Sequence, residues 1–209
     1  VGVAQLRVPC SSRAVFESKS LKRYLQSFSQ TAFASAYGVV RTLESDLSVT
    51  VGAPVVVDLL SMSQALQAGV GSFPGECLDT LKLSASMYRP DPGLLDVVRD
   101  GRVASESLYS NLLRSLCPVT GQPDIGSIQV VYTGTRIDHE ALLRYIISFR
   151  EHQGFHEQCV ERIFLDIMDR CRPRELTVYA RYLRRGGIDI NPCRSTEKGI
   201  PPHLRLARQ

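Results

Sequence analysis

Cys117 and Asp124 are the first residues of this chain whose types and spacing could do covalent chemistry. Asp124 is the seventh residue after Cys117 in the stretch CPVTGQPD, which contains the turn-forming residues proline and glycine. A turn of this size can bring a carboxyl group close to the sulfur, so that a thiol nucleophile and a proton donor lie together. The same residues also fit a buried core cysteine and an ordinary turn aspartate, and the spacing alone does not separate the two interpretations.

The segment Phe155-His156-Glu157 is a candidate for recognition of a purine-like base. A carboxylate can accept two N–H bonds from the edge of a guanine-like ring, and an adjacent histidine can hold the bound group. Alternatively, Glu157 stabilises the positive end of the helix that begins there. His152 and His156 also have metal-ligand spacing, but Gly154 between them indicates a helix break, which disfavours zinc.

Two further segments have residue types that favour a phosphate. Glu17-Ser18-Lys19-Ser20 opens a predicted helix, where backbone N–H groups, serine and lysine favour an anion. Arg184-Arg185-Gly186-Gly187 is a predicted turn between strands, where arginine and accessible backbone suit a phosphate or diphosphate. The alternatives are an ordinary helix N-cap and a basic hairpin tip. Gly69, Gly71 and Gly75 do not form a dinucleotide-binding motif, because their spacing is one residue too long.

The elements that would position these residues follow one order, strand, two helices and strand, twice along the chain. This order predicts an α+β protein with antiparallel β-sheets and paired helices packed on one face. The first half is expected to have strands at 1–8 and 55–60 and helices at 21–28 and 39–47. The second half is expected to have strands at 127–132, 176–182 and 188–190 and helices at 142–147 and 160–171. A further helical stretch at 107–116 would place Cys117 at a helix end.

We therefore expect two modules, one at 1–106 and one at 107–209. The first includes a connection rich in Gly, Ser and Pro over 61–104, with one more strand. It is one strand short at its start and the chain lacks an initiator Met, so we expect that an N-terminal segment is missing.

The bulk composition limits the class of protein. The chain has 209 residues, 44% of them hydrophobic, and no apolar run approaches the roughly 20 residues that span a bilayer. Its net charge of +4 suits a protein that binds phosphorylated ligands as well as one that binds nucleic acid. Its six cysteines include no C-x-x-C pair, which predicts reduced thiols and a cytoplasmic location.

Four stretches of the chain together resemble the NADPH-dependent 7-cyano-7-deazaguanine reductases, the nitrile reductases of queuosine biosynthesis, a tRNA modification. They are FESKSLKRYLQSFSQT, CPVTGQPDIGS, ISFREHQGFHEQCVERIF and YARYLRRGGIDINP. The likeness is strongest from 107 to 194 and weakest over 50–104. It implies tandem tunnelling-fold modules, a homodimer or larger homo-oligomer, and a small deazapurine substrate. It implies no metal and no direct nucleic-acid or membrane partner.

The same resemblance implies a role for individual residues. Cys117 would be the nucleophile that forms a covalent thioimide with the nitrile carbon, and Asp124 would be the proton donor. The substrate contacts would be Phe16, Glu17, Ser18, His156 and Glu157, and the NADPH contacts would be Ser18, Lys19, Arg185 and Gly186. Two positions depart from the family pattern and could alter the pocket walls: Ile125, where an aromatic residue is expected, and Cys193, where tryptophan is expected.

The implied chemistry is reduction of the nitrile to 7-aminomethyl-7-deazaguanine. A nitrile carbon accepts hydride poorly until a nucleophile adds to it, and a thiolate of lowered pKa adds well. Two NADPH molecules would complete the reduction through an imine, so the site must exclude water. One alternative is a zinc-dependent tunnelling-fold cyclohydrolase with Cys117 and His156 as ligands, which metal analysis would detect. Another is a non-enzymatic tRNA-binding module that uses the basic C-terminal region, which salt-sensitive RNA binding would indicate.

Overall fold

The structure, a computed structural model, describes residues 2–67, 69–84, 87–199 and 201–209. The chain divides into two compact units, with the boundary between Gly69 and Val70. This boundary lies before the expected one at 106/107. The reason is that the connecting segment packs with the second unit, where Leu78 and Leu95 belong to the hydrophobic core.

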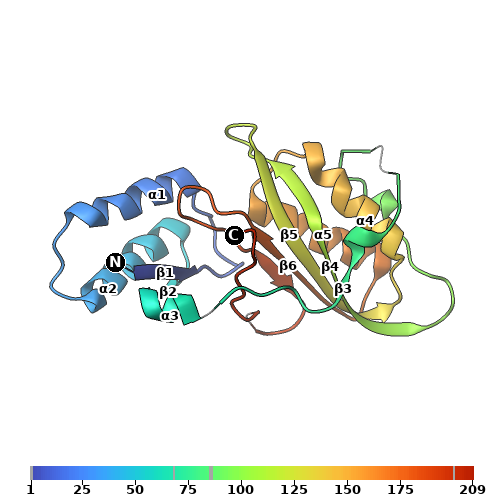
Figure 1. The fold of residues 1–209 in the computed structure, drawn as a ribbon, viewed down its shortest axis with the longest axis horizontal. Coiled ribbons are helices and arrows are strands. Elements are labelled where there is room, and N and C mark those ends of the chain that lie inside the picture. The colour runs from blue at the N-terminus through green and yellow to red at the C-terminus, as the bar shows by residue number, and fades with distance from the viewer. Residues whose placement is uncertain (1, 68, 85–86, 200) are drawn as a thin grey trace. The chain divides into compact units, whose positions relative to one another are not determined.

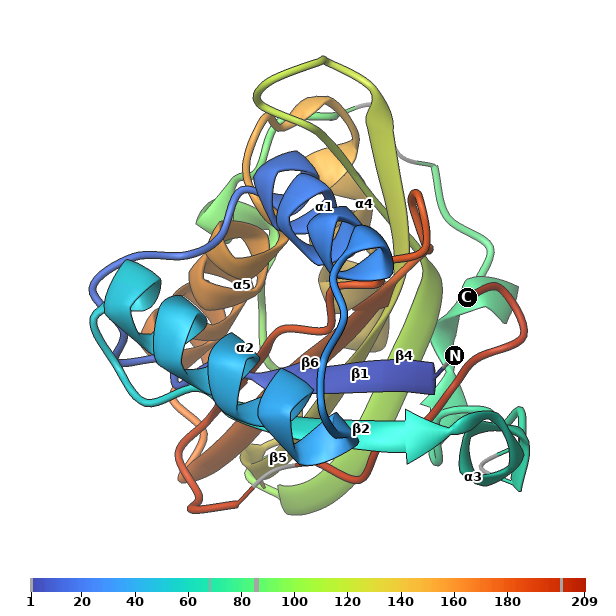
Figure 2. The ribbon, with the colours of Figure 1, turned by 90° about the vertical axis from the view of Figure 1, so that its left-hand side faces the viewer.

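In the first unit, two helices pack on a two-stranded antiparallel sheet (Figure 2). Its elements are β1 (Gly2–Arg7), α1 (Ser18–Ser27), α2 (Ala36–Val51), β2 (Val56–Ser61) and the short α3 (Met62–Gln67). Leu43, Leu47 and Val51 recur every four residues along α2 and pack against Val55 and Val57. The predicted strands and helices of this half are confirmed, and the apolar period of each element accounts for it.

The second unit is built on a five-stranded sheet in the order β3-β4-β5-β6-β7 (Figure 1). Its strands are β3 (Glu76–Cys77), β4 (Val103–Leu116), β5 (Pro123–Thr135), β6 (Glu175–Tyr182) and β7 (Cys193–Ser195). β3 runs parallel to β4, and the other pairs are antiparallel. β4 and β5 form a long hairpin whose loop, residues 117–122, begins at Cys117.

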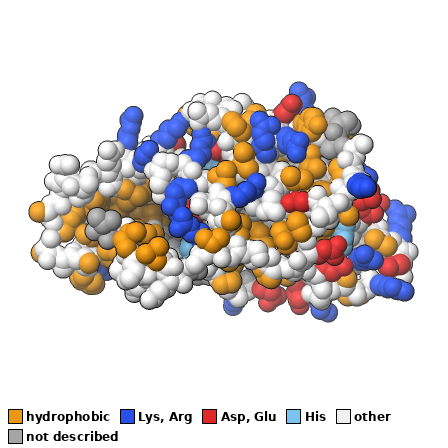
Figure 3. Space-filling view, in the orientation of Figure 1, with side chains coloured by type: hydrophobic (Ala, Val, Ile, Leu, Met, Phe, Trp, Pro, Cys, Tyr) orange, Lys and Arg blue, Asp and Glu red, His pale blue; other side chains and the backbone are white. Residues whose placement is uncertain are grey.

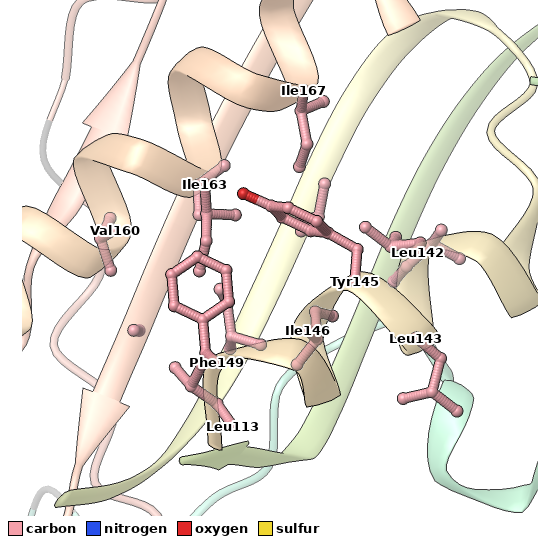
Figure 4. Packing of buried hydrophobic residues seen from close by; sticks show 14 of the residues in the cluster. Leu113, Leu142, Leu143, Tyr145, Ile146, Phe149, Val160, Ile163 and Ile167 are labelled. Carbon is pink, nitrogen blue, oxygen red and sulfur yellow. The ribbon is translucent and has the colours of Figure 1, made fainter. Parts of the chain in front are cut away.

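The main core lies between this sheet and the helices α4 (His139–Ser148) and α5 (His156–Cys171). Ile128, Val130 and Tyr132 alternate along β5 on the core side. Figure 4 shows the facing side chains of Tyr145 on α4 and Ile163 on α5 in the same cluster. Burying each large apolar side chain contributes about 1.5–3 kcal/mol, so this core holds the β4–β5 hairpin in place. The α+β class with antiparallel strands and helices on one face is confirmed.

The prediction of a helix at 107–116 was wrong, because this stretch is part of β4. The leucines here have helical spacing, but a β-bulge between Ser110 and Leu113 shifts the register with β5 and removes strict alternation. Asp79 holds the bulge by accepting hydrogen bonds from Ser110 Oγ at 2.6 Å and the Asn111 amide at 3.1 Å. Cys117 therefore follows a strand end.

The expected returning strand at 188–190 was also wrong. The returning strand is Cys193–Ser195, which pairs with residues Thr177 to Tyr179 of β6. The Gly186-Gly187 turn is followed instead by irregular backbone, in which Arg185 and Ile188 form an isolated bridge. Among the described residues, no helix has both the length and the apolar character needed to cross a membrane.

Candidate active site

Cys117 is half-buried in the loop of the β4–β5 hairpin, and the loop is closed by its own backbone. The Cys117 amide donates to the Gln122 carbonyl at 2.8 Å, and the Gly121 amide donates to the Cys117 carbonyl at 2.8 Å. Pro118 occupies the position after Cys117, where its fixed φ favours a turn. Two long paired strands thus hold the sulfur at the end of a rigid ladder.

The environment of Cys117 favours the thiolate. Burial raises the pKa of this thiol, but hydrogen bonds from the Thr120 side chain and from the Thr120 and Val119 backbone outweigh it, and the pKa is lowered. The charge of Asp124 acts in the opposite direction and raises the pKa of the Cys117 thiol. A partly accessible thiol of lowered pKa has the character of a nucleophile.

Two other cysteines of this unit have the opposite character. Burial raises the pKa of Cys159 and of Cys171 to about 11 in each case. Both belong to α5 and are buried in the core, and all six cysteines of the chain are free thiols. These two therefore serve packing, as small apolar side chains.

The segment before α5 runs beside the end of β4 and brings His156 to the site. The Leu116 amide donates to the His152 carbonyl at 2.8 Å, and the Gly154 amide donates to the Leu116 carbonyl at 3.1 Å. A Cβ atom at Gly154 would lie 3.0 Å from His152 Nε2 and 3.4 Å from Cys159 Sγ. A side chain here would therefore push the His152 ring aside by a few tenths of an ångström, so glycine favours this close approach.

Asp124 is buried at the start of β5 between a histidine and an arginine. Its side chain is 3% exposed, its Oδ2 lies 3.6 Å from His156 Nε2, and its Oδ1 accepts a hydrogen bond from Arg185 Nη1. Burial raises the pKa of Asp124, but the hydrogen bond and charge of His156 and the charge of Arg185 lower it further than burial raises it. Asp124 is therefore a carboxylate in the ligand-free protein at neutral pH.

His156 is held from its other side by Tyr182. The two rings meet edge to face, with centroids 4.0 Å apart and an angle of 72° between the planes. Tyr182 is the last residue of β6 and is 1% exposed, so the ring of His156 rests on a fixed surface. This contact orients the imidazole toward Asp124.

Glu157 lies in the first turn of α5, next to His156. Its side chain is half-buried and has no hydrogen-bond or ion-pair partner among the residues that the structure describes. Phe155 precedes the helix, and its amide donates to the Gln158 side chain at 3.2 Å. The N-terminal position stabilises the Glu157 carboxylate and leaves its oxygens available to N–H donors of a ligand.

The remaining predicted site residues, Phe16 to Lys19, lie at the start of α1 in the first unit. Glu17 is the N-cap, and its two carboxylate oxygens accept the amides of Lys19 at 3.0 Å and Ser20 at 2.8 Å. These hydrogen bonds, that from the Lys19 amide first, lower the pKa of Glu17. Glu17 thus occupies the helix amides that a phosphate would use, while the Ser18 hydroxyl and the Lys19 ammonium are outside this cap. Phe16 packs against the core of the same unit.

The structure thus brings Cys117, Asp124, His156 and Arg185 together within the second unit. It also adds two residues that the sequence did not indicate, Tyr182 and Gln122. Tyr182 could have been found as the last apolar residue of the alternating strand, but Gln122 carries no signal beyond its place in the loop.

The two residues that depart from the family pattern lie in different places. The Ile125 carbonyl accepts the Leu183 amide at 2.9 Å. Cys193 packs on the other face of the sheet, against the cluster of Phe73, Tyr179 and Leu206.

Two features of the second unit bear on the alternative functions. Among the described residues, no three His, Cys, Asp or Glu side chains are grouped so as to hold a metal ion. On the face of the second unit shown in Figure 3, basic side chains are dispersed among hydrophobic, neutral and acidic ones.

Comparison with known proteins gives one consistent family. Residues 1–59 match a family described as the N-terminal part of the nitrile reductase 7-cyano-7-deazaguanine reductase, and residues 123–200 match one described as QueF-like protein. The NADPH-dependent 7-cyano-7-deazaguanine reductases of Burkholderia multivorans and Burkholderia ambifaria are each 52% identical to this chain over 210 residues. The alignments cover 100% of this chain and 77% of each relative. A crystal structure of the archaeosine synthase QueF-Like matches 49% of this chain and 100% of its own at 15% identity, with a TM-score of 0.41.

Proposed function

Because the chain belongs to the family of NADPH-dependent 7-cyano-7-deazaguanine reductases, we propose that it reduces the nitrile of this base through a covalent adduct on Cys117. The product would be 7-aminomethyl-7-deazaguanine, an intermediate of queuosine biosynthesis. One observation supports the covalent route above the others. Cys117 is a partly accessible thiol of lowered pKa on a rigid loop beside a buried carboxylate.

The adduct step needs a nucleophile and a route for one proton. We propose that Asp124, ionised before substrate binds, takes the thiol proton as Sγ bonds to the nitrile carbon. Asp124 then delivers this proton to the nitrile nitrogen. A C–S bond replaces one C–N π bond, giving a thioimide with no net gain or loss of protons. His156 keeps Asp124 in place for both transfers, as general acid–base catalysis requires.

Recognition of the base falls to the start of α5. Glu157 can accept two N–H bonds from the guanine-like edge, and His156 lies beside it on the first turn. A site built to bond these N–H groups discriminates strongly against a ring that lacks them, because its carboxylate would be left unpaired. Phe16, Glu17 and Ser18 are proposed as further substrate contacts on the first unit. For Glu17 this requires its carboxylate to leave the helix amides.

The chain offers residues that fit the phosphates of NADPH. Gly186 and Gly187 have φ of 62° and 87°, and a Cβ atom at Gly187 would meet nothing within 4 Å, so this backbone is open to a ligand. We propose that Gly186, Arg185, the Lys19 ammonium and the Ser18 hydroxyl hold the phosphates. NADPH, when bound, supplies the hydride equivalents for the reduction.

Intact-mass spectrometry with the nitrile base and no NADPH tests this function. The expected result is a mass increase equal to the whole base, located on the peptide that contains Cys117, and release of the amine once NADPH is added. Wild-type protein that binds the base but gains no mass would contradict the covalent route. Homo-oligomeric assembly and a cytoplasmic location stay predictions, and light scattering tests the first.

A further inference from the structure

The side chain of Arg185 links two parts of the candidate active site. Its Nη1 donates to Asp124 Oδ1 and its Nη2 donates to Gln122 Oε1. Asp124 belongs to β5, whereas Gln122 closes the loop by accepting the Cys117 amide at 2.8 Å. A single planar guanidinium therefore ties the carboxylate to the loop that carries the nucleophile, with a geometry that a lysine ammonium cannot reproduce.

The backbone of Arg185 is fixed by hydrogen bonds within the second unit. Just before it, the Leu183 amide donates to the Ile125 carbonyl at 2.9 Å and continues the β5–β6 ladder. The Arg185 amide itself donates to the Ile188 carbonyl at 2.9 Å and closes the turn. The arginine is thus presented to Asp124 without any contribution from a ligand.

The far side of the turn is held by the side chain of Gln209. Its Nε2 donates to Asn191 Oδ1 at 2.8 Å, to Asp189 Oδ2 at 3.3 Å and to the Tyr182 carbonyl at 3.0 Å. Its Oε1 accepts from Arg181 Nε at 2.7 Å, and Arg181 is buried. One side chain therefore clamps the end of β6 to the segment that follows the turn, which limits the movement of Arg185.

Binding of a cofactor phosphate would not by itself explain why Arg185 pairs with a buried carboxylate. Asp124 is 3% exposed, and an ion taken this far from water must be compensated by partners of opposite charge. We propose that Arg185 is a positioning residue for thiol addition, which holds the Asp124 carboxylate in register with the Cys117 loop before NADPH binds. This role rests on the proposed function and is additional to any contact with the cofactor.

Loss of Arg185 should affect the adduct step in two ways. The charged or titratable groups that interact with Asp124 are His156 and Arg185, Cys117 across the loop, and the buried Cys159 and Tyr182. Without the guanidinium, the carboxylate and the loop can move apart, and a misplacement of about 1 Å can cost ~10²-fold in rate. The pKa of Asp124 should also rise, because one of the charges that lowers it is gone.

The test is the rate of adduct formation with the nitrile base and no NADPH, followed by rapid quenching and intact-mass spectrometry. Arg185→Ala should lower this rate by about 100-fold. The adduct rate of Arg185→Lys should lie between those of the wild type and Arg185→Ala, because lysine keeps the charge but cannot span both acceptors. Arg144→Ala is the charge-matched control, since Arg144 pairs with Glu140 on an exposed face of α4, and it should keep the wild-type rate.

Two further readouts separate positioning from a general structural role. Millimolar guanidinium should restore part of the rate to Arg185→Ala and none to a variant that is merely destabilised. The limb of the pH–rate profile that Asp124 governs should move to higher pH in Arg185→Ala. Gln122→Met, which removes only the second acceptor from an exposed loop residue, should show a smaller fall of several-fold.

An adduct rate in Arg185→Ala within about twofold of wild type, with a raised KM for NADPH, would overturn the proposal and make Arg185 a cofactor contact alone. That result would leave the proposed function intact, because the wild-type protein would still form the adduct. If the wild-type protein formed no adduct, both the proposed function and the positioning role of Arg185 would be contradicted. Should Arg185→Ala fail to fold, wild-type adduct rates in both Arg185→Lys and Gln122→Met would overturn the positioning role.

Discussion

The two ends of the β4–β5 ladder carry similar polar clusters. At the loop end, Asp124 meets His156 at 3.6 Å and accepts a hydrogen bond from Arg185. At the opposite end, Glu106 meets His139 Nε2 at 3.2 Å and Arg136 Nε at 3.7 Å. Each cluster thus contains a carboxylate, a histidine and an arginine, the residue types by which a catalytic site is often recognised.

The clusters differ in what they adjoin and how they are held. Asp124 is 3% exposed and lies opposite Ser115 at the loop end that carries Cys117, whereas the Glu106 side chain is 23% exposed and accepts a hydrogen bond from the Tyr132 hydroxyl. That hydroxyl also accepts the Ile137 amide at 2.8 Å, so the Glu106 cluster joins the end of the ladder to the start of α4. A carboxylate, a histidine and an arginine in contact are therefore not sufficient to identify a catalytic site, and the loop end differs in carrying a cysteine.

Removing the nucleophile should give the largest effect. Cys117→Ala should reduce adduct formation and turnover below detection, because the other thiol near this end, Cys159, is buried and burial raises its pKa to about 11. Intact-mass spectrometry and NADPH oxidation measure the two losses. Cys10→Ala, at an exposed thiol of the first unit, should behave as wild type. An adduct that persists in Cys117→Ala would mean that the loop end is not the reacting end.

Asp124→Asn should slow adduct formation by about 10²–10⁴-fold, the usual contribution of general acid–base catalysis, while base binding stays largely intact. The charge of Asp124 raises the pKa of the Cys117 thiol, so the variant should alkylate at lower pH than wild type. Single-turnover kinetics and the pH profile of alkylation by iodoacetamide measure these opposite changes. Glu106→Gln, at the other end, should alter neither. Equal slowing by the two substitutions would remove the distinction between the clusters.

Glu157→Gln should weaken base binding by about 1.5–3 kcal/mol, the value of hydrogen bonds to a charged group, and leave NADPH binding nearly unchanged. The reason is that a carboxylate accepts from two N–H groups, whereas an amide presents one acceptor and one donor. Calorimetry with each ligand, in a Cys117→Ala background that prevents the adduct, measures the two affinities. Similar losses for both ligands would instead indicate that Glu157 serves to start α5.

The smallest effect should come from the opposite end of the ladder and concern stability. Burial raises the pKa of Glu106, but hydrogen bonds from Tyr132 and His139 and the charges of His139 and Arg136 lower it further. A carboxyl group whose pKa is lowered in the folded state stabilises the fold at pH values above its ordinary pKa of 4.5. This stabilisation is lost as the pH falls through the folded-state pKa. Glu106→Gln should therefore lower the free energy of unfolding by about 1 kcal/mol or less at pH 7, and this difference from the wild type should shrink in acid. Urea unfolding at several pH values measures this difference in stability. A difference that grew in acid would contradict a stabilising role for the ionised Glu106.

Local sequence determined most of the helices and strands of this chain. The i, i+4 leucines of α2, the alternation in β6 and the Asp138 cap of α4, which accepts the Ala141 amide at 2.9 Å, all act between near neighbours. Their physical causes, apolar periodicity and capping of free amides, can be read directly from residue order. The resemblance to one family, carried by four short motifs, added candidate residues that spacing alone left open.

Tertiary structure decided what those residues can do together. Arg185 and Asp124 are 61 positions apart, and nothing in either local pattern predicts that they pair. The periodicity of residues 107–116 predicted a helix. They form a bulged strand instead, because pairing with β5 sets their conformation. Likewise, Tyr182 supports His156 only because Leu116 and Gly154 bring the start of α5 beside β6. Contacts that depend on long-range pairing leave no periodic trace in the sequence, since packing of the finished sheet selects them.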